Sequence, residues 1–231
     1  MAIYSVILLT AAPAGQSSEA GGAYVKVDGR ESLLRAVEMF LNRDNVKQLQ
    51  LVVTQQSAEE AKRKFGANLG LYGVKLVAGG VKWIEQIQAA GKNVAAECSH
   101  VLVHDTARPA VPYTDIEAAM GESEKSDAVI LAAPVRSSLI ELDEGSAGLA
   151  YHLPSRFMQI QTPQIFARKV FDQMVKSGAE PHASQVKIVR GSPLNIRVGS
   201  ASDASFAKAM IAMLPKPKIR AASSPFDEAQ W

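Results

Sequence analysis

Residues 101–112 read Val-Leu-Val-His-Asp-Thr-Ala-Arg-Pro-Ala-Val-Pro, and this stretch decides the fold. Its first three residues are apolar without alternation, which is typical of a short strand covered on both faces in a parallel sheet. Pro109 and Pro112 keep the following residues out of a helix until after Tyr113. We therefore expect Asp105 at the carboxyl end of a buried strand, which is where open α/β sheets bind their ligands.

Strand-like and helix-like segments alternate before and after this stretch. Apolar runs predict strands at 3–9, 49–53, 74–77, 101–103 and 128–132. Helical spacing and capping-box patterns predict helices at 33–41, 57–65, 82–90 and 114–122. Each crossover is long enough for a right-handed βαβ unit, so we expect an α/β fold with a doubly wound, mostly parallel, Rossmann-like sheet and helices on both faces.

The pattern changes after residue 134. Two short runs at 137–143 and 149–153 flank a turn-forming sequence and predict a β-hairpin, not a βαβ unit. We expect this hairpin, at about 135–155, to be an arm inserted into the domain, and the edge strands of such arms pair readily with a partner chain. Later segments predict a helix at 168–176, strands at 186–189 and 195–198, and a last helix capped by 200–203.

The expected organisation is one domain over residues 1–214 and a flexible tail over 215–231, which is rich in Pro, Lys, Ala and Ser. The 231 residues carry a net charge of +2 with both signs mixed, which gives no case for binding nucleic acid or a membrane surface. Cys98 is the single cysteine, so the chain has no internal disulfide. The N-terminus lacks the basic region of a signal peptide, and we expect a cytoplasmic protein.

Polar residues at the strand ends are the candidates for chemistry. Asp105 either binds Mg²⁺ together with substrate phosphates or caps its loop through bonds to the backbone. His104 is either an acid–base group or, the favoured interpretation, a residue that orients the loop. Arg108 either binds a phosphate or pairs with Asp105 as a structural clamp. The small-residue loop at 10–22 suits close approach of backbone N–H groups to a phosphate, but a merely flexible loop has the same composition.

Three residues beyond the arm are also candidates. Arg156 is suited to bidentate phosphate binding, although a lone arginine is more often a solvated surface residue. Thr162 is held extended before Pro163, and its hydroxyl either contacts a ligand or satisfies the loop. Arg197 lies in a predicted strand, where its side chain faces either solvent or a site.

Three motifs occur in an order and spacing that resemble one family. They are 104–109 (His-Asp-Thr-Ala-Arg-Pro), 161–166 (Gln-Thr-Pro-Gln-Ile-Phe) with Arg156 before it, and 191–197 (Gly-Ser-Pro-Leu-Asn-Ile-Arg). Together they resemble the 2-C-methyl-D-erythritol 4-phosphate cytidylyltransferases of the non-mevalonate isoprenoid pathway. The resemblance implies a nucleotidyltransferase fold, a homodimer with interlocked hairpin arms, and transfer of a cytidylyl group from CTP to a sugar-alcohol phosphate with release of pyrophosphate.

The resemblance also implies roles for residues. Asp105 would be the Mg²⁺ ligand, and Arg197 would take the place of a basic residue that is usually lysine; with Arg156 they form the expected catalytic set. Arg156 and Thr162 would bind the methylerythritol phosphate across the dimer interface. The remaining expected substrate-binding residues are Ala11, Ala12, Gly80 and Arg108.

The chain departs from the family pattern in its first loop. The family's arginine and its Pro-Lys-Gln segment fall near residues 17–18 and 21–23, where this chain has no basic residue. Lys26 is either the shifted catalytic lysine or, the favoured interpretation, an exposed residue of an extended stretch. Beyond Gly80, Trp83 and Gln86 replace an arginine and a serine near the base. Each lost positioned charge typically costs on the order of a hundred- to a thousandfold in rate. Two alternatives therefore stand beside the transferase: an impaired paralogue that binds a nucleotide or a partner, and a nucleotidyltransferase with another sugar-phosphate acceptor.

Overall fold

The computed structural model of the chain describes residues 2–13 and 22–214, so most of the first loop and the tail predicted to be flexible at 215–231 lie outside the described residues. The strands are β1 (Tyr4–Leu9), β2 (Lys26–Val27), β3 (Arg30–Glu31), β4 (Val46–Thr54), β5 (Lys75–Gly79), β6 (His100–Asp105), β7 (Ala128–Pro134), β8 (Leu139–Leu142), β9 (Gly148–His152), β10 (Met158–Ala167) and β11 (Lys187–Arg190). The α-helices are α1 (Ser32–Leu41), α2 (Ala58–Leu71), α3 (Trp83–Gly91), α4 (Tyr113–Ser123), α5 (Arg168–Ser177) and α6 (Asp203–Met213). Short 3₁₀ turns are η1 (Gly22–Tyr24), η2 (Gln55–Ser57), η3 (Pro154–Arg156) and η4 (Ala183–Gln185).

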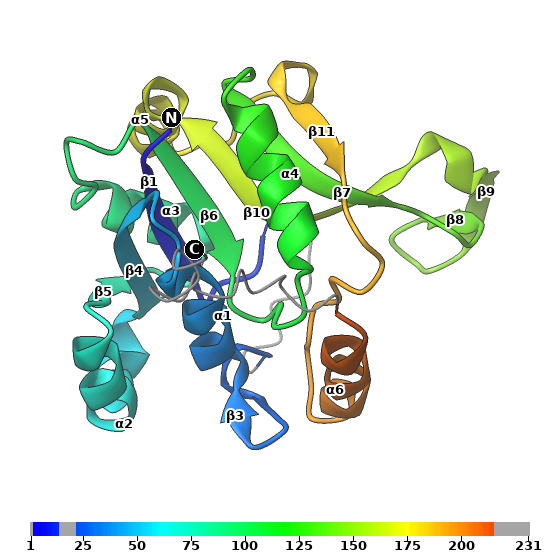
Figure 1. Cartoon of the computed structure of the whole chain (residues 1–231). Helices are drawn as coiled ribbons and strands as arrows, with labels where there is room; N and C mark the ends of the chain where they lie inside the picture. The colour runs from blue at the N-terminus through cyan, green and yellow to red at the C-terminus, as the bar shows by residue number, and fades with distance from the viewer. Residues whose placement is uncertain (1, 14–21, 215–231) are drawn as a thin grey trace, which may run out of the picture.

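A seven-stranded sheet crosses the molecule in the order β11-β7-β10-β6-β1-β4-β5 (Figure 1). β1 pairs in parallel with both β4 and β6, which places the first strand in the middle of the sheet. β10 runs antiparallel between β6 and β7, and the other pairings of this sheet are parallel. The predicted doubly wound, mostly parallel sheet is confirmed. β10 contains residues 161–164, which the sequence analysis treated as a loop. The hydrophobic periodicity of the sequence does not predict this central strand.

Helices cover both faces of the sheet. α1, α2 and α4 bury apolar side chains on one face, in a cluster that includes Phe40, Phe65 and Ile116. α3 and α5 bury theirs on the other face, in a cluster that includes Ile87 and Phe171. β1 lies between these layers with all six residues buried, which explains its unbroken apolar run. No helix of the described part of the chain is long and apolar enough to cross a lipid bilayer.

The segment at 195–198 is not a strand, so that prediction is wrong. Its backbone pairs with the loop after β6 instead, since the Val198 N–H donates to the Ala107 carbonyl at 2.8 Å. Val198 also packs with Val27 of β2 and Ala207 of α6 in a small separate cluster. This cluster fastens the segment against the carboxyl end of β6, at the edge of the sheet where the site lies.

The predicted helix caps are only partly right. The boxes at 57–60 and 114–117 are wrong, because no side chain caps α2 or α4. The η2 turn precedes α2 directly, so Thr54 accepts the Ser57 N–H one turn earlier. At α6 the N-cap Ser202 makes no side-chain cap bond either, but Asp203, the first residue of the helix, accepts the N–H groups of Gly199 and Ser200, so only the backward half of the predicted cap forms.

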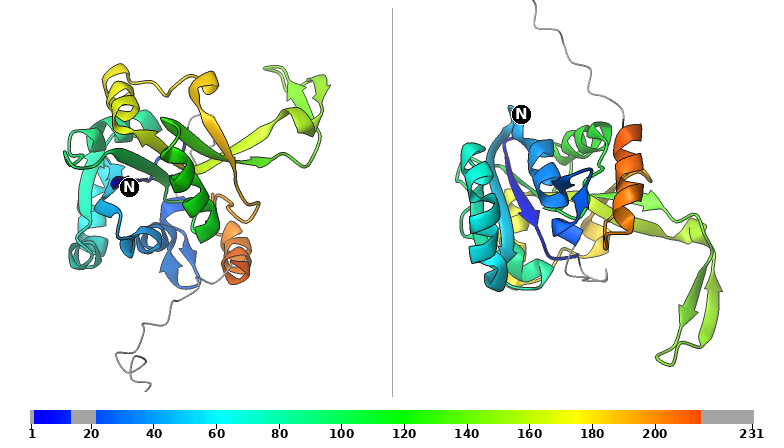
Figure 2. Two further views of the ribbon diagram at one scale, coloured as in Figure 1. Left: turned by 45° about the horizontal axis from the view of Figure 1, so that its top comes forward. Right: turned by 90° about the horizontal axis from the view of Figure 1, so that it is seen from below.

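β8 and β9 form the predicted hairpin, which projects from the body of the molecule as an arm (Figure 2). The two strands pair antiparallel, with Ile140 opposite Tyr151. β8 is exposed along its whole length, and β9 is exposed up to His152, which is half-buried. A two-stranded hairpin without a third layer is marginally stable in water, so this arm needs a surface that covers it.

Candidate active site

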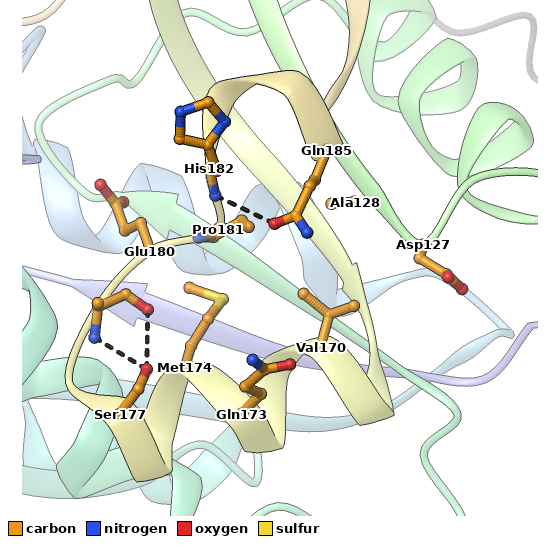
Figure 3. A pocket seen from close by; sticks show the side chains of 11 residues that line it. Asp127, Ala128, Val170, Gln173, Met174, Ser177, Glu180, Pro181, His182 and Gln185 are labelled. Atoms are coloured by element: carbon orange, nitrogen blue, oxygen red, sulfur yellow. Dashed lines mark hydrogen bonds between the residues drawn. The ribbon is translucent and has the colours of Figure 1, made fainter.

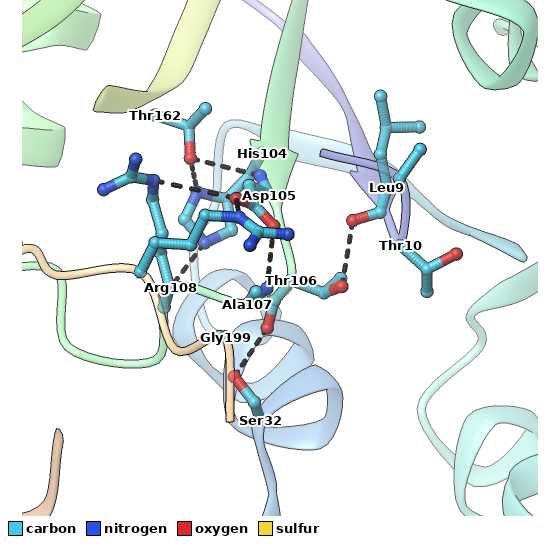
Figure 4. Close-up of polar contacts among 12 residues, drawn as sticks. Leu9, Thr10, Ser32, His104, Asp105, Thr106, Ala107, Arg108, Thr162 and Gly199 are labelled. Atoms are coloured by element: carbon cyan, nitrogen blue, oxygen red, sulfur yellow. Dashed lines mark hydrogen bonds and ion pairs between the residues drawn. The ribbon is translucent and has the colours of Figure 1, made fainter. Parts of the chain in front are cut away.

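The predicted residues at the carboxyl end of β6 come together as an ion cluster (Figure 4). Asp105, the last residue of β6, is completely buried. Its Oδ2 lies 2.8 Å from Arg197 Nε and 3.8 Å from Arg108 Nε. Burial raises the pKa of the Asp105 carboxyl, and the charges of Arg197 and Arg108 oppose that rise. With the carboxylate ionised, two guanidinium groups face one carboxylate, so the cluster carries an excess positive charge that suits an anionic ligand.

The loop after β6 is fixed by hydrogen bonds to β1, to α1 and within the loop itself. The Thr106 N–H and hydroxyl both donate to the Leu9 carbonyl, at 3.0 and 2.9 Å. The Ser32 hydroxyl donates to the Thr106 carbonyl at 2.6 Å. The other oxygen of Asp105, Oδ1, accepts the Ala107 N–H at 2.9 Å. The interpretation of Asp105 as a loop cap is therefore confirmed, and the turn holds its carboxylate rigidly.

A series of hydrogen bonds links the Asp105 backbone to Thr162 and His104. The Asp105 N–H donates to Thr162 Oγ1 at 3.1 Å, and the Thr162 hydroxyl lies 2.9 Å from His104 Nδ1. His104 Nε2 lies 3.2 Å from the Arg108 carbonyl, which can only accept, so the proton is on Nε2 and Nδ1 accepts from Thr162. Burial lowers the pKa of His104 to about 3, which keeps the ring neutral.

These hydrogen bonds bear on two pairs of alternatives that the sequence left open, one for His104 and one for Thr162. His104 orients the loop, as favoured, because both of its ring nitrogens are used inside the protein. Thr162 is completely buried and its hydroxyl both accepts and donates within the protein. Within this chain the Thr162 hydroxyl therefore satisfies the loop, and the substrate contact predicted for Thr162 across a dimer interface stays a prediction.

The predicted Mg²⁺ role of Asp105 can be compared with the geometry. Both carboxylate oxygens have partners, and the side chain has no exposed surface. Among the residues that the structure describes, no group of three His, Cys, Asp or Glu side chains could hold a metal ion. One carboxylate with substrate phosphates needs no such group, so Mg²⁺ binding by Asp105 stays a prediction, and no catalytic step below depends on it.

Two residues of the sequence motifs, Asn195 and Gln161, connect the segments around the cluster. Asn195 Nδ2 donates to the Thr162 carbonyl at 2.8 Å, and the Asn195 carbonyl accepts from Arg108 Nη1 at 2.8 Å. Gln161 Nε2 donates to the Ser192 carbonyl at 2.9 Å. Both residues belong to the motifs of the sequence, which assigned them no role. Both side chains are buried although they are polar, and their hydrogen bonds make them positioning residues.

Three of the predicted substrate-binding residues, Ala11, Ala12 and Gly80, lie just beyond the ends of β1 and β5. Ala11 is buried, Ala12 is half-buried, and Gly80 follows β5. Gln86 of α3, which the sequence placed only as a departure from the family pattern, contacts this group: its side chain accepts the Ala11 N–H and donates to the Gly80 carbonyl. The available signal was a glutamine within the buried stripe of an amphipathic helix, where an amide needs polar partners.

Arg156 and Lys26 lie outside the cluster. Arg156 is exposed at the base of the arm, beside a groove of about 390 Å³ that Met158, Ile160 and Ile188 also line. Lys26 has a side chain that is 65% exposed and pairs with Glu31 at 3.8 Å. The interpretation of Lys26 as an exposed residue of an extended stretch is confirmed.

A larger hollow of about 550 Å³ lies at the opposite end of the sheet (Figure 3). Ala128, the first residue of β7, lines it together with Met174 of α5 and Glu180. It contains none of the predicted site residues. Because ligands of doubly wound folds bind at the carboxyl ends of the strands, the cluster around Asp105 is the candidate active site.

Fold and candidate site together define the class: a doubly wound α/β protein with a cluster of two arginines and one aspartate at the carboxyl edge of its sheet. The family model described as 2-C-methyl-D-erythritol 4-phosphate cytidylyltransferase matches residues 5–213. The chain belongs to that family.

Relatives and solved structures agree with this membership. The 2-C-methyl-D-erythritol 4-phosphate cytidylyltransferase of Rhodopirellula baltica is 26% identical, over 89% of this chain and 93% of its own length. The enzyme of the same name from Halalkalibacterium halodurans is also 26% identical, over 90% and 97%. The crystal structure of 4-diphosphocytidyl-2C-methyl-D-erythritol synthase from Anaerococcus prevotii superposes with a TM-score of 0.74 at 21% identity, covering 91% of this chain and 99% of that one. That likeness concerns the fold.

Proposed function

We propose that this chain is a cytidylyltransferase that transfers a cytidylyl group from CTP to 2-C-methyl-D-erythritol 4-phosphate and releases pyrophosphate, a step of isoprenoid precursor synthesis. The observation that carries the proposal is the family match over residues 5–213. The reaction needs little covalent help from the protein. A phosphate oxygen of the acceptor attacks the α-phosphorus of CTP, and the bond to the pyrophosphate leaving group breaks.

The cluster supplies electrostatic stabilisation in this proposal. Negative charge builds up on the transferring phosphoryl group and on the leaving group, and a fixed cation near them lowers the barrier. Arg197 has a side chain that is 13% exposed, while Asp105 and Arg108 are essentially buried, so Arg197 is on the outer side of the cluster. Asp105 and Arg108 act through Arg197: the carboxylate holds the guanidinium, and Arg108 holds the Asn195 carbonyl next to it.

The roles of the other predicted residues stay proposals. Ala11, Ala12 and Gly80 are assigned to the nucleotide because they lie at the ligand-binding edge of the sheet. Mg²⁺ stays a prediction for the reaction, with Asp105 as the predicted ligand beside the substrate phosphates. The single domain over 1–214 and the cytoplasmic location likewise stay predictions from the sequence.

We also propose a homodimer joined through the arms, with Arg156 acting across the interface on the site of the other subunit. The arm supports this because it exposes large apolar side chains that water disfavours: Leu139, Ile140, Leu142, Leu149, Tyr151 and Leu153. The groove beside Arg156 continues this apolar surface onto the body, where Met158, Ile160 and Ile188 are 40–54% exposed. A second copy of the chain presents the same apolar residues and therefore suits this surface.

The proposed activity is tested with the purified full-length chain. CTP, 2-C-methyl-D-erythritol 4-phosphate and Mg²⁺ should give pyrophosphate and a cytidine diphosphate conjugate of the acceptor, detected by mass spectrometry. Omitting the acceptor is the control, since hydrolysis of CTP alone would also release phosphate. Binding of CTP without any conjugate would contradict the transferase and support the impaired paralogue.

A further inference from the structure

The segment that carries Arg197 leaves the sheet at Ser192. The Gly191 N–H still donates to the Ala132 carbonyl of β7 at 2.9 Å, directly after β11. The next N–H, that of Ser192, donates instead to the Asp115 carboxylate, with 2.6 Å between the nitrogen and Oδ2. Asp115 belongs to the first turn of α4 and lies 77 positions earlier in the chain. The path from the sheet to Arg197 therefore begins at a side chain of α4, past which the segment runs (Figure 1).

The contact depends on the side chain of Asp115. A negative charge in the first turn stabilises α4 through the helix dipole wherever the carboxylate points, so the bond to another segment is additional. Asp115 is half-buried, and burial raises the pKa of its carboxyl, while the hydrogen bond from Ser192 opposes that rise. The donor is a backbone N–H, which almost any residue at position 192 supplies. Asp115 is therefore the member of this pair that a substitution can test.

Further hydrogen bonds fix the turn that Ser192 begins. The Ser192 carbonyl accepts Gln161 Nε2 at 2.9 Å and the Asn195 N–H at 3.2 Å. The Ser192 hydroxyl accepts the Leu194 N–H at 3.1 Å. Arg197 follows this turn by two residues, so a shift of Ser192 is passed along the chain to the guanidinium.

We propose that Asp115 is a positioning residue for Arg197: its carboxylate fixes where the turn at 192–195 starts, and the turn sets where the guanidinium lies. The inference rests on the proposed function, in which Arg197 stabilises the charge that develops on the transferring phosphoryl group. Misplacing a group in an active site by about 1 Å can cost on the order of a hundredfold in rate. Val198 keeps its bond to the Ala107 carbonyl when the Asp115 contact is removed, so the expected loss is smaller, about tenfold in kcat.

Exchange of the Arg197 Nε–H with water tests the inference without any need for activity. This proton lies between the guanidinium and the buried Asp105 carboxylate, and its NMR signal is identified by its absence from Arg197→Ala. Asp115→Ala removes the acceptor, and Asp115→Ser shortens it but keeps a polar group in the first turn of α4. Each should speed the exchange about tenfold, the equivalent of one hydrogen bond to a charged group. Asp115→Asn keeps an oxygen acceptor at the same reach and should stay within about threefold of the unaltered chain.

The same helix offers a matched control. Glu122, near the other end of α4, accepts the Ser126 hydroxyl at 3.0 Å, so Glu122→Ala should leave the exchange and kcat unchanged. Unchanged exchange in Asp115→Ala and Asp115→Ser overturns the inference, and so does an equally large rise in Asp115→Asn. Asp115→Ser decides the matter where Asp115→Ala fails to fold.

Transferase kinetics show whether Asp115 acts through Arg197. Asp115→Ala should lower kcat about tenfold and leave the KM for CTP within about twofold, because the contact made by Arg197 strengthens in the transition state. Added to Arg197→Ala, the same change should lower kcat no further. An equal loss in both backgrounds overturns the inference, because Asp115 would then act independently of Arg197. A chain without transferase activity contradicts the proposed function alone, and the exchange rates then decide whether Asp115 positions Arg197.

Discussion

Arg197 Nε lies 2.8 Å from Asp105 Oδ2 and joins residues 92 positions apart in the chain. The Asp105 carboxylate has no exposed surface, and its second oxygen holds the Ala107 N–H. Because the carboxylate is buried and also held by a backbone N–H, it restricts the position of the Arg197 guanidinium. In the structure Asp105 therefore holds the Arg197 guanidinium in place.

Replacing Asp105 should destabilise the protein even when no metal is present. Asp105→Asn removes the carboxylate that pairs with Arg197 and Arg108, and breaking a buried pair in this way costs about 3–5 kcal/mol. Urea unfolding in the presence of a chelator measures the loss. Asp172→Asn is the control, because Asp172 makes an Arg168 contact of the same 2.8 Å on the surface, where such a pair is worth less than about 1 kcal/mol. Equal stability of Asp105→Asn and the unaltered chain would contradict the anchoring role.

The neutral state of His104 should make stability depend on pH. The pKa of His104 is about 3 in the folded protein and near its ordinary 6.5 in the unfolded chain. The unfolded chain therefore binds the proton first, so this contribution is complete above pH 6.5 and is lost as the pH falls towards 3. Between pH 7 and pH 5 the free energy of unfolding should fall by roughly 2 kcal/mol from this residue.

Urea titrations at both pH values test this effect in His104→Gln, whose amide keeps a donor and an acceptor without titrating. The variant should lose most of the pH-dependent fall. His182→Gln removes an exposed histidine and should keep it. A fall that persists unchanged in His104→Gln would show that other groups cause it.

The fold could be predicted from the sequence wherever burial determines residue type. β6 and its terminal Asp105 follow from an apolar run and two prolines, and the arm follows from its turn sequence. β10 could not be predicted, because Gln161 and Gln164 interrupt the apolar pattern of a central strand. The Gln161 amide bonds to the Ser192 carbonyl inside the fold, so a polar residue takes a buried position that the pattern reserves for apolar ones.

The site was predictable as a set of residues but not as an arrangement. The sequence named Asp105, Arg108 and Arg197 and offered the pairing of Arg108 with Asp105, yet it did not show that Arg197 contacts the same carboxylate oxygen. The sequence likewise did not show that the Thr162 hydroxyl accepts the Asp105 N–H from a neighbouring strand. Packing decides which side chains far apart in the chain become partners, and a local sequence pattern does not report packing.

A methyl group at Gly22 should displace the segment that carries Arg197. A Cβ there would overlap the Val198 carbonyl oxygen and lie 2.9 Å from Ala107 Cβ. We expect Gly22→Ala to lower the free energy of unfolding by about 1–3 kcal/mol, as overpacking does. Gly66→Ala is the matched control, because a Cβ there meets only Lys62 Cγ at 3.7 Å within α2 and should stabilise by about 0.5–1 kcal/mol. If both changes had the same sign, close packing at Gly22 would be ruled out as the cause.

Charges on the arm should separate the proposed dimer. Ile140 and Leu142 lie two residues apart on β8, so their side chains share a face of the hairpin. The double change Ile140→Asp and Leu142→Asp should convert the dimer to a folded monomer, measured by light scattering and circular dichroism. Leu71→Asp is the control, because Leu71 is 82% exposed on α2, away from the arm, and should leave the mass unchanged. A monomeric unaltered chain would contradict the proposed interface.

Mixing two inactive variants should restore activity if Arg156 acts across that interface. Arg156→Ala removes the arm residue, and Arg197→Ala removes the cation beside Asp105. In a mixed dimer, one of the two sites combines an intact Arg197 from one subunit with an intact Arg156 from the other. Random reassociation makes half of the dimers mixed, so transferase activity should recover to roughly a quarter of that of the unaltered chain. If Arg156 instead served its own subunit, every site would lack one arginine, and the mixture would stay as inactive as its components.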